Sequence, residues 1–71
     1  MPHEVKAQIT GVVFQIVARH GERVNAGDPI LVLESMKVEI PVEAPREGTI
    51  SEIRVNEGET VQEGDTVAFL D

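Results

Sequence analysis

A pattern of about thirty residues occurs twice in the chain, and this repeat restricts the possible fold more than any other feature. Shifting the sequence by 37 positions aligns residues 5–34 with residues 42–71 without a gap. Glycines are favoured where the backbone adopts a conformation that is costly for other residues, so shared glycines indicate shared turns. Ten aligned pairs are identical, three of them glycines: Val5/Val42, Ala7/Ala44, Gly11/Gly48, Ile16/Ile53, Gly21/Gly58, Glu22/Glu59, Val24/Val61, Gly27/Gly64, Asp28/Asp65 and Leu33/Leu70.

Within each copy the local pattern predicts short β-strands. Apolar, β-branched runs alternate with glycine-containing turns, and no periodic segment is long enough for a helix. Small all-β chains avoid exposed edges by pairing two sheets or closing a barrel, so we predict a pseudo-twofold sandwich in which one copy leads each sheet. The predicted strands are Val5–Ile9, Val12–Val17, Val24, Ile30–Leu33, Val38–Val42, Thr49–Val55, Val61 and Val67–Leu70.

Composition limits what such a sandwich can do. The 71 residues suit one small domain, and with no cysteine there is no disulfide to stabilise it. Phe14 and Phe69 are the only aromatic residues, which predicts a core of Val, Ile and Leu. A net charge of −7 argues against nucleic-acid binding. The chain has neither an apolar span of about 18 residues nor a secretion signal, so we expect a cytoplasmic protein.

The connector between the two copies, residues 35–41, is the one segment that the repeat does not explain. If the last strand of the first copy pairs with the first strand of the second, this connector contains a hairpin turn with Met36 and Lys37 near its tip. The chain termini would then lie together at the opposite end. Lys37 is one of only two lysines, the other being Lys6. An apolar Met36 beside it suggests a recognition surface, although core packing of Met36 stays open at this point.

The residues from Glu34 to Val38 resemble the attachment sequence of biotinyl domains, the biotin carboxyl carrier family, whose pattern is Glu-Ala/Ser-Met-Lys-Met. The resemblance extends to the flanking runs Gly27–Glu34, Ala44–Gly48 and Gly58–Asp65. It implies a single biotinyl domain over residues 1–71, with an attachment hairpin at residues 34–40. The implied fold is a flattened sandwich (a barrel-sandwich hybrid) of two four-stranded antiparallel sheets. The segment from Gly11 to Gly21 is too short for the thumb loop of some bacterial carriers, so a thumbless version is expected.

By this resemblance, a biotin–protein ligase joins biotin to the ε-amine of Lys37. Glu34, Ser35, Met36 and Val38 would serve recognition by the ligase and later partners, with Val38 departing from the usual methionine. The family carries a carboxyl group between biotin carboxylase and carboxyltransferase. The chain is thus expected to be a non-catalytic carrier subunit of a biotin-dependent carboxylase, an acyl-CoA enzyme such as acetyl-CoA carboxylase being favoured.

Other chemistries have little support in the sequence. His3 and His20 are not at metal-ligand spacing, and Ser35 has no obvious base, so neither a metal site nor a catalytic site is predicted. We interpret the many carboxylates as solubilising. Residues 42–71 contain two basic and eight acidic residues, which suggests an acidic flank that steers docking.

Two alternative functions remain open from the sequence. Lipoyl domains are similar in fold but usually carry Asp-Lys-Ala at the hairpin, and Met36 and Val38 match neither neighbour of that lysine. The chain would also fit an unmodified interaction module of a larger assembly.

Overall fold

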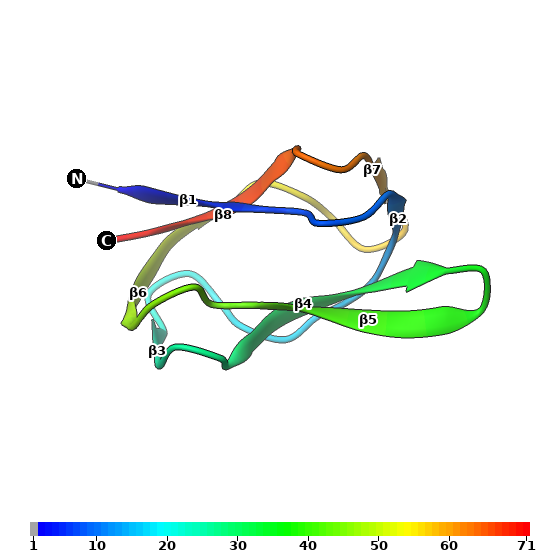
Figure 1. The fold of residues 1–71 in the computed structure, drawn as a ribbon. Helices are drawn as coiled ribbons and strands as arrows, with labels where there is room; N and C mark the ends of the chain where they lie inside the picture. The colour runs from blue at the N-terminus through cyan, green and yellow to red at the C-terminus, as the bar shows by residue number, and fades with distance from the viewer. Residues whose placement is uncertain (1) are drawn as a thin grey trace.

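Two antiparallel sheets of four strands each pack face to face in residues 2–71, the part of the chain described by the computed structural model (Figure 1). The sheet orders are β1-β8-β6-β3 and β5-β4-β2-β7. This arrangement confirms the predicted all-β sandwich. The strands are β1 (His3–Lys6), β2 (Gly11–Ile16), β3 (Arg23–Val24), β4 (Pro29–Ser35), β5 (Val38–Glu43), β6 (Gly48–Ile53), β7 (Thr60–Val61) and β8 (Thr66–Leu70). No helix in this part of the chain is long and apolar enough to cross a membrane.

The internal repeat is visible in the topology. A shift of 37 residues carries β1, β2, β3 and β4 onto β5, β6, β7 and β8, and it converts the strand order of one sheet into that of the other. Each copy therefore contributes two strands to each sheet. The strands of residues 42–71 are divided between both sheets, with Glu43 in β5 and Glu52 in β6, and the acidic flank expected from the sequence stays a prediction.

Backbone hydrogen bonds join the two copies at symmetric points. The Ala7 N–H donates to the Asp65 carbonyl at 2.9 Å, and the Gly64 N–H donates to the Ala7 carbonyl at 2.8 Å. The repeat-related bonds join Ala44 to Asp28 at 2.8 Å and to Gly27 at 2.9 Å. Each copy is thus held by a turn of the other.

These bonds explain why the predicted first strand, Val5–Ile9, is wrong in its bounds. The register of β1 against β8 shifts between Val5 and Lys6, and β1 ends there. Ala7 then leaves the ladder to bond with the Gly64-Asp65 turn, so the apolar pattern after it belongs to a connection.

Four turns with a glycine followed by a carboxylate residue share one geometry. In residues 62–65, Gly64 has φ +91°, and the Asp65 N–H donates to the Gln62 carbonyl at 2.9 Å. The Asp65 carboxylate accepts the Gln62 N–H at 2.9 Å, so the side chain closes the same turn. The other three turns use Glu22, Asp28 and Glu59 in the same way. These carboxylates have structural roles, which the interpretation of acidic residues as solubilising missed.

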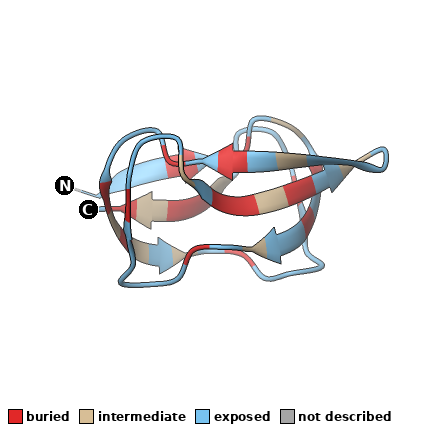
Figure 2. Cartoon of the chain, turned by 90° about the horizontal axis from the view of Figure 1, so that it is seen from below, coloured by how far each residue is buried: buried red, intermediate tan, exposed pale blue. Residues whose placement is uncertain are grey.

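The core lies between the sheets and is aliphatic, as predicted. Sixteen apolar residues are buried, all of them Val, Ile, Leu or Ala, and there is no buried polar or charged side chain in the described residues. Figure 2 shows buried and exposed positions interspersed along the strands, while most of the turns are exposed. The largest fully buried side chains are Val13, Ile30, Leu31, Leu33, Ile50, Val67 and Leu70.

We predict that Gly64→Val lowers the free energy of unfolding by about 1 kcal/mol or more. A Cβ at Gly64 meets nothing within 4 Å, so the cost comes from the positive φ and not from a clash. Urea denaturation measures the change. Gln62→Val, at an exposed position of the same turn, is the matched control and should leave stability within about 0.5 kcal/mol of the parent. An equal loss in both variants would contradict a role for the left-handed glycine.

Candidate functional site: the β4–β5 hairpin

The hairpin between β4 and β5 is the covalent connection between the two copies of the repeat. Ser35 pairs with Val38, Glu34 with Glu39 and Leu33 with Ile40, so the turn contains only two residues, Met36 and Lys37. The corresponding place in the other sheet holds the ends of β1 and β8, where His3 pairs with Leu70. Figure 1 shows the hairpin projecting at the end of the molecule opposite the chain termini.

Met36 and Lys37 both adopt left-handed backbone conformations. Their φ angles are +53° and +65°, and they are the only residues other than glycine with positive φ in the described chain. Two-residue hairpins of this type favour Asn-Gly or Asp-Gly, because larger L-residues are strained there. Strain of this kind costs about 1–3 kcal/mol for each residue. The neighbouring structure therefore tolerates an unfavourable residue pair at the tip, which points to a function for the pair.

Burial does not compensate for this strain. The Met36 side chain is 93% exposed, which excludes the core packing that the sequence left open, and Val38 is 56% exposed. Glu34 is exposed and Ser35 is half-buried at the base of the turn. The structure thus brings together all five residues from 34 to 38, and it presents two apolar side chains to solvent on either side of Lys37.

Lys37 is also exposed and free of ion pairs with the rest of the described chain. The other lysine, Lys6, lies 3.7 Å from Glu4, while Arg23 and Arg54 lie 3.6 and 3.4 Å from Glu47 and Glu52. An amine at the end of a flexible stem and clear of its own domain is accessible to an enzyme that acylates it. Such an acylation would remove its charge and lengthen the side chain into a tether.

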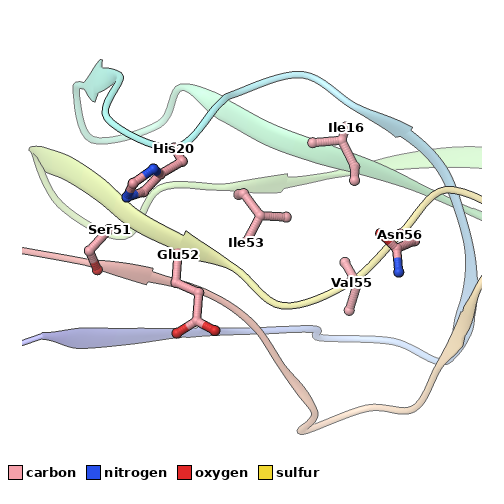
Figure 3. A pocket seen from close by; sticks show the side chains of 7 residues that line it. All are labelled: Ile16, His20, Ser51, Glu52, Ile53, Val55 and Asn56. Carbon is pink, nitrogen blue, oxygen red and sulfur yellow. The ribbon is translucent and has the colours of Figure 1, made fainter.

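The other candidates from the sequence do not assemble a site. A depression of about 480 Å³ contains His20 and Glu52 near one end, and Asn56 near the other, with Ile16 and Ile53 between them (Figure 3). These polar groups do not converge on a common point. No cluster of three or more metal-ligating side chains occurs within residues 2–71.

The fold and the exposed lysine of the hairpin define a class of small carrier domain that presents a covalently attached group. The family described as "Biotin-requiring enzyme" matches residues 1–70, and the chain belongs to this family. Its cofactor is biotin, and the domain is a carrier that is not catalytic by itself.

Individual relatives agree with this assignment. The chain is 39% identical to "Biotinylated protein TB7.3 homolog" of Mycobacterium leprae over 99% of both chains. It is 40% identical to the biotin carboxyl carrier protein of acetyl-CoA carboxylase of Solanum lycopersicum, over 84% of this chain and 86% of that one. Among solved structures, urea carboxylase of Kluyveromyces lactis superposes with a TM-score of 0.95 and 32% identity. The match covers all of this chain and 6% of that enzyme.

The link between β2 and β3 also agrees with a thumbless domain. It comprises residues 17–22, and the Gly21 turn occupies part of it. No loop there extends toward the hairpin as a thumb would.

We predict that Met36→Asn raises the free energy of unfolding by about 0.5 kcal/mol. Asparagine tolerates the left-handed conformation better than methionine, and replacing a side chain that is 93% exposed sacrifices almost no burial. Urea denaturation of the two proteins tests this. A loss of stability in Met36→Asn would show that the left-handed conformation of Met36 does not strain the turn.

Proposed function

We propose that Lys37 is the residue to which a biotin–protein ligase attaches biotin, and that the domain then carries a carboxyl group between the active sites of a biotin-dependent carboxylase. The observation that carries the proposal is an exposed lysine that forms no ion pair within residues 2–71, held at the tip of a strained two-residue turn. Met36, Val38, Glu34 and Ser35 surround it and are the proposed recognition residues. The proposed compartment is the cytoplasm.

The chain's own contribution is presentation. The Lys37 Nζ, after losing a proton, attacks the carboxyl carbon that the ligase has activated, and an amide forms as the activating group leaves. When bound, biotin supplies a ureido nitrogen that accepts CO₂ and later releases it. The rigid pair of sheets fixes the base of the arm, while the lysine stem lets its end move. Tethering of this kind raises the effective concentration of the carried group at each partner.

The proposed partners are the ligase, a biotin carboxylase and a carboxyltransferase. We favour an acyl-CoA acceptor, such as acetyl-CoA, on the likeness to the plant acetyl-CoA carboxylase carrier. The related domain of the yeast enzyme is named as part of a urea carboxylase, which supports the view that the transferase, and not the carrier, selects the acceptor.

Intact mass and peptide mapping after co-expression with a biotin–protein ligase test the attachment site. We expect the mass of one biotinyl group on Lys37, no addition in Lys37→Arg, and normal addition in the control Lys6→Arg, since Lys6 is paired with Glu4 in β1. Modification of Lys37→Arg, or none in the parent, would overturn the proposal. A parallel experiment uses a lipoate ligase. Addition of lipoate but not of biotin would favour a lipoyl carrier, and absence of both modifications would favour an interaction module.

We predict that Met36→Asp slows biotinylation by about tenfold or more while leaving the unfolding midpoint nearly unchanged. The substitution removes an apolar contact for the ligase and adds a charge beside Lys37, at a position that contributes no burial. Ligation rates at limiting domain concentration give the first value and urea denaturation gives the second. Glu63→Asp, on an exposed turn of the opposite repeat, is a control that should alter neither.

A further inference from the structure

The exposed apolar side chains are distributed unevenly over the two sheets. Val12, Phe14 and Val17 are 39%, 49% and 42% exposed, and all three lie on β2 or directly after it. Together with Met36 and Val38, they are all the large hydrophobic residues that are exposed in the described chain. All five belong to the sheet that presents Lys37, or to the turns that leave its strands.

The internal repeat provides a control for this distribution. The residues of the second copy that correspond to Val12, Phe14 and Val17 are Thr49, Ser51 and Arg54. The same backbone positions are therefore compatible with polar side chains in the same fold. The apolar residues at the first copy are not required by the architecture, so they need another explanation.

The corresponding outer face of the other sheet is shielded. Arg54 lies over the ring of Phe69, 5.7 Å from its centroid, and pairs with Glu52 at 3.4 Å. These three residues correspond to Val17, Val32 and Gln15 in the hairpin sheet, which cannot form such a pair. The apolar surface of the hairpin sheet is thus left uncovered by its own domain.

The two sheets also differ in charge, and in the described chain the sheet with the exposed apolar residues is the one with unpaired acidic residues. The strands of the hairpin sheet contain Glu34, Glu39 and Glu43 and no basic residue, and none of the three glutamates forms an ion pair within residues 2–71. Glu34 and Glu39 lie directly opposite each other, an arrangement of like charges that destabilises a sheet. Acylation of Lys37 would remove the one positive charge of residues 29–43, the hairpin strands and their turn. A partner with basic groups would relieve the repulsion.

We propose that the outer face of β2, formed by Val12, Phe14 and Val17 and bordered by Glu34, is a docking surface for biotin carboxylase. Val12 pairs with Glu34, so the face begins near the hairpin and runs along β2 away from its tip. Biotin carboxylase fits best because both of its small substrates, ATP and bicarbonate, are anions, and an active site that attracts them is electropositive around its entrance whatever the final acceptor. An apolar face with an acidic border is complementary to such a surface.

The inference rests on the proposed function, and the test separates the two. The holo domain, with biotin on Lys37 verified by mass, is the varied substrate of the biotin carboxylase subunit of the same organism, and ADP formation is the readout. The variant Val12→Thr/Phe14→Ser copies the residues of the second repeat. We expect its KM to rise about fivefold or more with kcat unchanged. Ser51→Ala, at the position corresponding to Phe14, is the matched control and should behave like the parent.

A second variant tests the charge argument. Val17→Arg copies Arg54 and places a cation on the proposed face, so it should raise KM further than neutral substitutions do. The excess over the parent should shrink as the salt concentration rises, because screening weakens repulsion from a basic partner. Equal unfolding midpoints of parent and variants in urea establish that the substitutions act on the surface.

Four outcomes decide between the possibilities. If the parent is a substrate and the double variant is used equally well, β2 is not the docking face. If ligation is slowed and ADP formation is not, the face belongs to the ligase, and if only transfer to the acceptor is slowed, it belongs to the transferase. Either result overturns the inference while leaving the carrier function intact. If the biotinylated parent is not used by the carboxylase, the proposed function fails and the inference with it.

Discussion

Each copy of the repeat is fixed in place by a turn that belongs to the other copy. Ala7 forms backbone hydrogen bonds with the Gly64-Asp65 turn, and Ala44 forms the equivalent bonds with the Gly27-Asp28 turn. Each of these turns is stabilised by a glycine in the left-handed conformation and by an aspartate carboxylate that closes the turn. A chain of 71 residues buries a limited core, so these bonds between the two copies have a large share in defining the structure. The position of the hairpin follows from this arrangement, since β4 and β5 are the strands that join the copies.

The proposed attachment site lies where the symmetry of the repeat is broken. In one sheet the equivalent strands end at the two chain termini, and in the other they are connected through Met36 and Lys37. Because this turn has no counterpart, its sequence is free of the requirements that fix the other four turns. It is therefore a place where the domain can hold residues that are poor for stability and suited to a partner.

Much of this was predictable from sequence because the determining signals are local or periodic. The glycine pairs predicted the repeated turns, the alternating apolar runs predicted the sandwich, and the connector predicted the position of Lys37. The end of β1 was not predictable, because Ala7 is removed from the strand by a bond to a turn 57 residues away. The turn-closing role of Asp28 and Asp65 had a local signal, a carboxylate directly after glycine in both copies, which composition alone had obscured. The positions of the acidic residues in space depend on strand order and on the turns, which a charge count along the chain does not contain.

The chain ends and Lys37 lie at opposite ends of a molecule whose longest dimension is 33 Å (Figure 1). A polypeptide continuing from either terminus would join the domain at the end opposite the lysine. The same fold can therefore serve alone or within a longer polypeptide, because a junction at either chain end does not obstruct an enzyme that approaches the hairpin tip. The same geometry suits both kinds of relative, one nearly identical in length to this domain and one in which the matching segment is 6% of the chain. Compatibility with both short and long polypeptides is thus a property of where the ends of the sandwich lie.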